Sequence, residues 1–155
     1  MGDDFNEAFL RSIISTGFKI PQTSILLSTG NPKEKAELIE ELKYLQDRGM
    51  KFYGTKGTAD FYKASGINVE ILNRPFDKME PAIVSHISDG KIDLVINIPK
   101  TTDKEELDSD YIIRRSAVDQ NVPLITNTQI AKRFFIALQN CDIFHSPVKS
   151  WNEYN

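Results

Sequence analysis

A chain of 155 residues with a formal net charge of −3 has the size of one globular domain. Its 40% hydrophobic and 26% charged residues are ordinary for such a domain, and its slight acidity gives no overall attraction to nucleic acid or anionic membranes. One cysteine, Cys141, excludes an intrachain disulfide framework. We therefore expect neither a nucleic-acid nor a membrane partner, and any anion site must be local.

Helix-like and strand-like segments alternate along the chain. An amphipathic helix is predicted at 4–16, with one face formed by Phe5, Ala8, Phe9, Ser12 and Ile13. A buried strand follows at 24–28, and then a long helix that starts around Pro32 and stops at Gly49. The later elements are a strand at 51–54, a helix at 58–66, a strand at 67–72, a helix at 81–89, a strand at 92–98, a helix at 109–121, a strand at 123–126 and a helix at 128–140.

Three of the predicted strands are continuous apolar runs rather than alternating ones. This pattern is typical of strands that helices cover on both faces, and hence of a parallel sheet. No internal repeat, linker or low-complexity segment interrupts the order. The sequence thus predicts a single-domain, three-layer α/β/α fold with a five-stranded, mostly parallel sheet.

Four of the predicted strands are each followed by hydroxyl- and amide-bearing side chains. These segments are residues 28–30, 54–58, 97–102 and 126–128. In an open parallel sheet, ligands bind outside the carboxyl ends of the strands. We therefore expect all four segments to open onto one crevice.

The segment 54–58, Gly-Thr-Lys-Gly-Thr, permits two interpretations. In the first, two hydroxyls, an ammonium group and backbone N–H groups at a helix N-terminus bind an anion, most simply a phosphate. In the second, Thr caps the helix and Gly allows a tight bend, and no ligand is needed. Lys56 and Arg74 are the cations expected nearest to this turn, although Arg74 in its loop could equally be a solvated residue.

Other chemistries have little support in the sequence. The two histidines, His86 and His145, lack spaced Cys or carboxylate partners for a metal. There is no nucleophile elbow and no Walker-type phosphate loop. The acidic stretch 103–110 is predicted to be a solvated loop that leads into a helix. Adjacent Arg114 and Arg115 must point in different directions, so one is expected in solvent, while the other either snorkels or pairs with Asp110 or Asp119.

Four segments together resemble the C-terminal methylglyoxal-synthase-like domain of the carbamoyl-phosphate synthetase large subunit: 15–21, 54–62, 93–99 and 110–127. The resemblance covers almost the whole chain and implies a Rossmann-like layered fold. It implies that residues 1–20 lead in from a preceding domain and that 21–155 form a regulatory domain. Such a domain binds an effector and passes the signal to the synthetase domains of the same chain.

The resemblance also implies what surrounds the domain. The parent enzyme is glutamine-hydrolysing, works with a small glutaminase subunit, uses ATP with Mg or Mn, and supplies carbamoyl phosphate for pyrimidine and arginine biosynthesis. The domain itself is expected to carry no cofactor and no metal, and to be non-catalytic and cytoplasmic.

The family's effector-contacting positions match residues of this chain. Its two threonines match Thr55 and Thr58, and its asparagine at the end of the fourth strand matches Asn97. A lysine of nucleotide-regulated members falls near Lys35, and another is replaced by Arg74. The whole predicted effector site comprises Lys35, Thr55, Lys56, Gly57, Thr58, Arg74, Asn97, Lys100, Thr101 and Thr102.

The type of effector is inferred from positions at which this sequence differs from a mitochondrial member of the family. Two asparagines of the N-acetylglutamate-dependent mitochondrial form are Lys100 and Asp110 here, and its tryptophan is Arg74. Cations at positions 74 and 100 favour a phosphorylated effector of the UMP or IMP type.

Two rivals remain. Methylglyoxal synthase shares the fold and eliminates phosphate from dihydroxyacetone phosphate, with a catalytic aspartate that falls close to Asp77. A lone carboxylate without histidine partners is a poor catalyst for that reaction. The third class, a scaffold without a small-molecule site, leaves the polar crevice residues unexplained.

Overall fold

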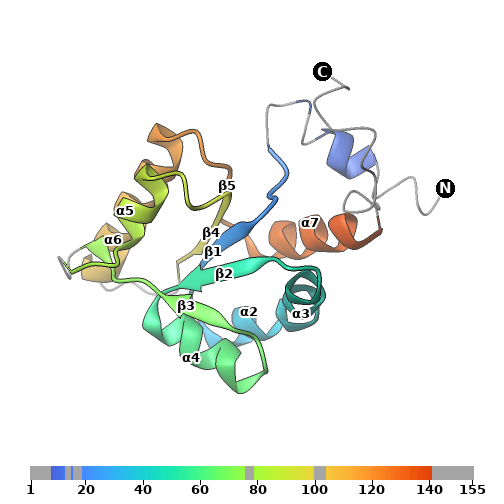
Figure 1. The fold of residues 1–155 in the computed structure, drawn as a ribbon, viewed down its shortest axis with the longest axis horizontal. Helices are drawn as coiled ribbons and strands as arrows, with labels where there is room; N and C mark the ends of the chain where they lie inside the picture. The colour runs from blue at the N-terminus through green and yellow to red at the C-terminus, as the bar shows by residue number, and fades with distance from the viewer. Residues whose placement is uncertain (1–7, 13–14, 16–18, 76–78, 100–103, 141–155) are drawn as a thin grey trace.

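The computed structural model describes residues 8–12, 15, 19–75, 79–99 and 104–140. Within these ranges strands and helices alternate, as the sequence predicts (Figure 1). The elements are β1 (Ser24–Thr29), α2 (Pro32–Ala36), α3 (Ile39–Asp47), β2 (Lys51–Gly54), α4 (Lys56–Ala64), β3 (Val69–Ile71), α5 (Ile83–Ser88), β4 (Leu94–Ile98), α6 (Lys104–Asp119), β5 (Leu124–Ile125) and α7 (Thr128–Asn140).

The five strands form one sheet in the order β3-β2-β1-β4-β5, and every pair is parallel. Strand β1 lies at the centre and all six of its residues are buried. Its Leu26 is in register with Tyr53 of β2 and with Val95 of β4. The continuous apolar strands of the sequence are thus the inner strands of the sheet.

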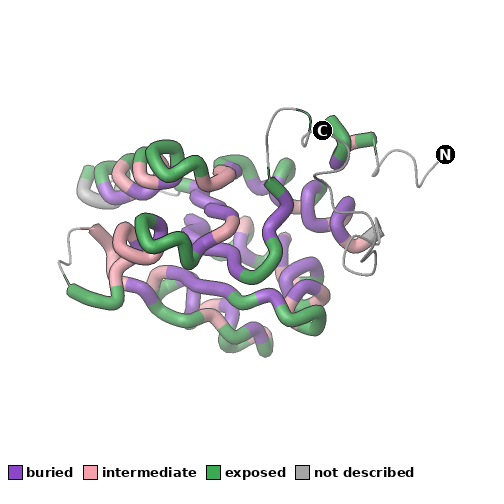
Figure 2. The backbone as a smooth tube through the Cα atoms, turned by 45° about the horizontal axis from the view of Figure 1, so that its top comes forward, coloured by how far each residue is buried: buried purple, intermediate pink, exposed green. Residues whose placement is uncertain are grey.

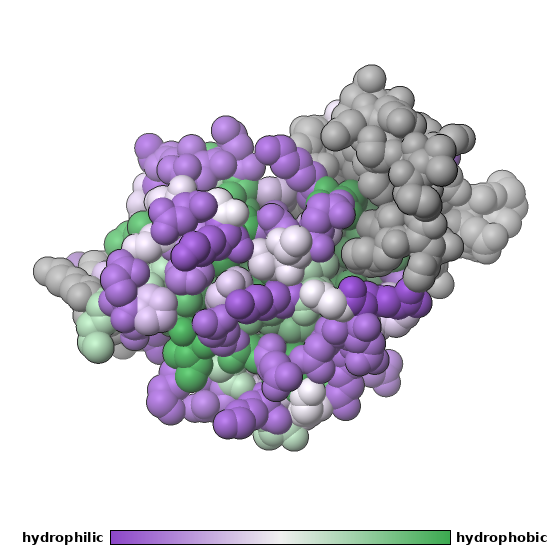
Figure 3. Space-filling view, in the orientation of Figure 1, coloured by the Kyte–Doolittle hydropathy of each residue, from purple (hydrophilic) through white to green (hydrophobic). Residues whose placement is uncertain are grey.

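Two apolar layers cover the faces of the sheet, which confirms the three-layer prediction. On one face, Ile25, Leu27 and Phe52 pack with buried side chains of α3, α4 and α7. On the other, Leu26 and Tyr53 pack with side chains of α5 and α6. Figure 2 shows the buried residues along the strands and the inner sides of the helices, and hydrophilic side chains cover most of the face in Figure 3.

The N-terminal helix differs from its prediction. Residues 8–12 are helical, but the fully buried side chain is Leu10, which joins the core of the α3, α4 and α7 layer. Ala8 and Ser12 are exposed and Phe9 is half-buried. The helix therefore packs through a different stripe from the one expected, and the remainder of the predicted face lies outside the described residues.

The helix expected between Pro32 and Gly49 is broken into α2 and α3. Asn31 caps its start, because its side chain accepts a hydrogen bond from Glu34 N at 2.9 Å. The break follows Lys35, whose carbonyl accepts hydrogen bonds from the Tyr62 hydroxyl at 2.8 Å and from Leu38 N at 3.2 Å. A side chain inserted into a helical ladder is a recognised cause of such a break.

The prediction of a solvated loop at 103–110 is wrong, because α6 already begins at Lys104. Lys, Glu and Leu in this stretch are good helix formers, and acidic residues are favoured in a first helical turn. The helix predicted at 109–121 thus begins earlier, and Ser109 and Asp110 lie inside it rather than at its start.

Candidate functional site

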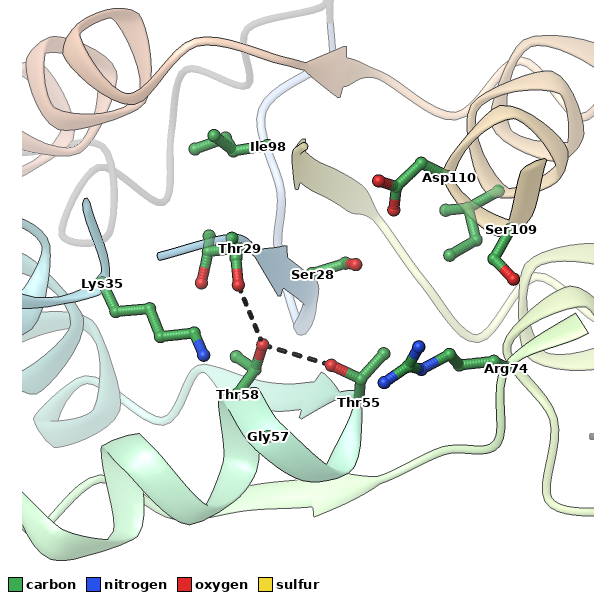
Figure 4. Close-up of a pocket in the computed structure, with 12 residues that line it drawn as sticks. Ser28, Thr29, Lys35, Thr55, Gly57, Thr58, Arg74, Ile98, Ser109 and Asp110 are labelled. Carbon is green, nitrogen blue, oxygen red and sulfur yellow. Dashed lines mark hydrogen bonds between the residues drawn. The ribbon is translucent and has the colours of Figure 1, made fainter. Parts of the chain in front are cut away.

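One cavity lies at the carboxyl ends of β1 and β2, at the edge of the sheet where the parallel fold predicts a ligand site. Its empty volume is about 480 Å³, a figure that includes space open to solvent. Figure 4 shows side chains from both sides of the sheet edge directed toward it. The lining residues are Ser28, Thr29, Gly30, Lys35, Thr55, Gly57, Thr58, Arg74, Ile98, Ser109, Asp110 and Ile113.

The turn from β2 into α4 forms the floor of this cavity. Thr55 occupies the N-cap position of α4, but its side chain makes no capping hydrogen bond. Its hydroxyl donates to Thr58 Oγ1 at 3.2 Å, and Thr58 donates to the Thr29 carbonyl at 3.4 Å (Figure 4). The two hydroxyls therefore lie side by side on the cavity wall. The interpretation without a ligand required Thr55 to cap the helix with its side chain, and it does not.

Two cationic side chains flank this turn. Lys35 is buried, with 7% of its surface exposed, and its ammonium lies 4.0 Å from where a Cβ on Gly57 would stand. Figure 4 shows Lys35 directed toward Thr58 from one side and Arg74 directed toward Thr55 from the other. Positive charge, hydroxyls and a helix N-terminus thus converge on one region, which is an arrangement that attracts anions.

A buried hydroxyl lies on the inner wall. Thr29 is 4% exposed, and its Oγ1 makes no hydrogen bond of ordinary geometry. Burial raises the pKa of the neighbouring Tyr62 phenol, and the nearby Thr29 hydroxyl offsets this only in part. The Tyr62 hydroxyl donates its hydrogen bond to the Lys35 carbonyl and not to Thr29. A buried polar atom without a partner at a cavity wall is an available contact for a ligand.

Helix α6 supplies the opposite wall. Asp110 projects from it into the cavity (Figure 4). Asn97 Nδ2 donates to Asp110 Oδ1 at 3.1 Å, and Arg114 donates to Asn97 Oδ1 at 3.1 Å. Arg115 points elsewhere and pairs with Asp119 at 3.1 Å, so the two arginines do split as their spacing predicts.

The predicted site residues therefore fall into three groups. Lys35, Thr55, Gly57, Thr58 and Arg74 lie together on the cavity. Lys56 is exposed and pairs with Asp60 at 3.0 Å, and Asn97 is fully buried behind the lining. Outside the described residues lie Lys100, Thr101, Thr102, Asp77, Cys141 and His145.

Sequence reasoning missed Ser109 and Ile113 as lining residues, although the helix predicted at 109–121 contains both. Which side of that helix meets the strand ends depends on packing between distant segments, which no local signal in the sequence reports.

The expected single crevice is divided in two. Residues 126–128 line a second hollow, together with Asn31, Lys33 and Glu34 of the β1–α2 region. Ile98 at the end of β4 lines both hollows. In the second hollow, Thr128 Oγ1 donates a hydrogen bond of 2.7 Å to Glu34 Oε2. The strand ends lie at one edge of the sheet as expected, but the side chains there form two hollows instead of one crevice.

The described residues contain no group of three or more His, Cys, Asp or Glu side chains placed to hold a metal ion. His86 lies away from the cavity, with its ring edge-on to Tyr53 at a centroid distance of 5.1 Å. None of the described helices is both long and apolar enough to cross a membrane.

Comparisons with known proteins place the chain in a family. The family model described as the MGS-like domain matches residues 37–126. "Multifunctional protein URA2" of Saccharomyces cerevisiae is 41% identical over 141 residues, which cover 85% of this chain and 6% of that protein. "Carbamoyl-phosphate synthase (ammonia), mitochondrial" of Homo sapiens is 36% identical over 142 residues, with coverages of 89% and 9%. The chain thus spans less than a tenth of these curated relatives.

Among solved structures, a crystal structure of methylglyoxal synthase from Elizabethkingia anophelis NUHP1 is similar, with a TM-score of 0.52. Its sequence is 17% identical, and the match covers 77% of this chain and 80% of that one. Such a likeness shows a shared fold alone. The family match spans more than half of the chain and includes β2, α4 and β4, which frame the cavity. The chain therefore belongs to the MGS-like domain family, in the form that carbamoyl-phosphate synthase proteins carry.

Proposed function

We propose that this chain is an effector-binding, allosteric domain that takes a phosphorylated nucleotide of the UMP or IMP type. The observation that supports this most directly is the convergence of Lys35, Arg74, Thr55 and Thr58 on one cavity at the start of α4. Charge-assisted hydrogen bonds to phosphate are among the strongest that a protein makes. In a molecule of net charge −3, such a local concentration of donors supports an anionic guest.

The proposed context is a longer, cytoplasmic carbamoyl-phosphate synthase. Its synthetase domains, with ATP, a divalent metal and a glutaminase partner, would make carbamoyl phosphate for pyrimidine and arginine biosynthesis. The effector alters that activity only if it binds two arrangements of the whole protein with different affinities. In this proposal the present chain contributes the ligand site.

The proposal is tested by calorimetric titration of the 155-residue chain with UMP, IMP and N-acetylglutamate. We expect saturable binding of at least one nucleotide. The variant Arg74→Met should weaken it by about tenfold or more, because it removes a charge-assisted contact. Lys63→Met is the matched control, since Lys63 is an exposed cation at the far end of α4. Binding of N-acetylglutamate without nucleotide binding would contradict the assignment.

The rival activity is tested with the same protein. The described lining of the cavity contains one carboxylate, Asp110, and no histidine. General acid–base catalysis of enolisation and phosphate elimination needs several such groups. Methylglyoxal formation from dihydroxyacetone phosphate, abolished by Asp77→Asn, would favour the lyase instead.

A further inference from the structure

We propose that Tyr62 and Phe61, neither of which lines the cavity, are positioning residues that hold the Lys35 ammonium over the first turn of α4. Lys35 belongs to α2, whereas the turn with Thr55 and Thr58 leads into α4. The inference rests on the proposed function and explains how two separate helices present one anion site.

Tyr62 fixes the backbone from which the Lys35 side chain starts. Its hydroxyl donates a hydrogen bond of 2.8 Å to the Lys35 carbonyl, and its side chain is fully buried. This carbonyl lies in the last turn of α2, where backbone oxygens lack partners within the helix. The hydrogen bond therefore ties the end of α2 to the body of α4.

The neighbouring residue Phe61 contacts the other end of the Lys35 side chain. The Lys35 Nζ lies 5.8 Å from the centroid of the Phe61 ring, within the range of a cation–π contact. The rings of Phe61 and Tyr62 are edge-on, with centroids 5.4 Å apart and an interplanar angle of 89°. Two consecutive residues of α4 thus hold both the backbone and the charged end of Lys35.

Burial leaves the Lys35 ammonium few alternative positions. The residue is 7% exposed, so its charged end cannot turn freely into water. The ammonium lies 4.0 Å from where a Cβ on Gly57 would stand, and Figure 4 shows it directed toward Thr58. Gly57 and Thr58 lie in the first turn of α4, and the two aromatic residues lie in the next turn.

One helix therefore sets the distance between the cation and the hydroxyls. Because the ligand turn and both aromatic contacts belong to α4, Lys35 keeps its place relative to that turn before an anion is bound. Groups that are ordered in advance lose less conformational entropy on binding, so this pre-organisation strengthens affinity. Arg74 comes from the segment after β3, on the other side of the turn (Figure 4), and so provides a comparison cation.

The test measures how Tyr62→Phe changes nucleotide binding in three backgrounds of the 155-residue chain, by calorimetry with UMP and IMP. In the wild-type background we expect binding to weaken about fivefold, as for the loss of one buried hydrogen bond that orders the site. In a Lys35→Met background the same change should alter affinity by less than about twofold, since no ammonium is left to position. In an Arg74→Met background the fivefold loss should persist, because Lys35 is still present.

Phe61 is tested with a pair of variants. Phe61→Leu should weaken binding by about threefold, because it removes the ring and keeps an apolar side chain. Phe61→Tyr should restore most of the affinity, since the ring face is kept. Tyr44→Phe is the control for the loss of a tyrosine hydroxyl, because the Tyr44 ring lies 4.9 Å from the Arg48 guanidinium and neither residue lines the cavity. Thermal unfolding would show that each variant is folded at the temperature of the titration.

The outcomes separate this inference from the proposed function. Equal losses from Tyr62→Phe in all three backgrounds would show a purely structural role, and no loss in the wild-type background would refute the positioning role as well. If Lys35→Met binds the nucleotide like the wild-type chain, the inference falls, whereas nucleotide binding itself stands. If the wild-type chain binds neither nucleotide, the proposed function falls, and this inference falls with it.

Discussion

Gly54 illustrates how a single residue sets the shape of the cavity floor. It ends β2, directly before the Thr55–Thr58 turn. A Cβ at this position would stand 2.8 Å from the Leu27 carbonyl oxygen and 3.0 Å from Val69 Cγ1. The first of these contacts is with backbone of the central strand, which cannot move without disturbing the sheet. The absence of a side chain therefore lets β2 pass close to β1 where the ligand turn begins.

We predict that Gly54→Ala destabilises the fold by about 1–3 kcal/mol, because an extra methyl group in a packed site forces neighbours to shift. Urea denaturation followed by circular dichroism would measure the change. Gly57→Ala is the comparison, since a Cβ there would come no closer than 4.0 Å to Lys35 Nζ. That variant should be neutral or slightly stabilising. Equal loss in both variants would show that the contact with Leu27 is not the cause.

At the scale of the elements, the sequence predicted those helix boundaries that neighbouring residues determine. The start of α2 was predictable, because Asn31 and Pro32 act through neighbouring residues. The stop near Gly49 was predictable for the same reason, and Gly49 has a φ of +94°. The break between α2 and α3 was not, because it depends on Tyr62, which is 27 residues away from Lys35 in the chain.

This break gives a prediction. Tyr62→Phe removes the buried hydrogen bond to the Lys35 carbonyl and should destabilise the fold by about 1 kcal/mol, the usual net contribution of such a bond. The backbone of Lys35 should also become less protected, which hydrogen exchange at 35–39 would detect. Tyr44→Phe is the control, since Tyr44 packs only partly buried against the core. Unchanged hydrogen exchange at 35–39 would show that the Tyr62 hydrogen bond does not cause the break between α2 and α3.

At the scale of the whole molecule, the sequence predicted the architecture better than the site. The apolar strands and their alternation with helices dictated a parallel sheet, and parallel order brought the strand ends to one edge. Which side chains share a cavity there depends on α6 and on contacts between distant segments. Asp110 lines the first cavity, whereas 126–128 line the second hollow, where Thr128 donates a hydrogen bond to Glu34.

Polar contacts join α7 to α3 and to the turn between α2 and α3. Lys132 Nζ lies 2.9 Å from Glu41 Oε1 and 2.8 Å from the Glu37 carbonyl. Gln129 also donates to Glu37 Oε2 at 3.0 Å. Glu41 is 4% exposed, so its charge is held away from water and depends on Lys132. These contacts link segments that are more than 90 residues apart in the chain.

We predict that Lys132→Met destabilises the fold by about 2 kcal/mol, less than for a fully buried pair because Lys132 is partly exposed. The loss has its cause in Glu41, which would stay buried without its counter-charge. The double variant Lys132→Met with Glu41→Leu should therefore recover most of the stability, since it removes the unpaired charge as well. Thermal and urea unfolding of the single and double variants would measure both effects. Gln129→Ala, at an exposed contact of the same helix, should change stability by less than about 0.5 kcal/mol. A double variant no more stable than Lys132→Met alone would show that packing of the lysine stem, rather than the buried carboxylate, holds α7 against α3.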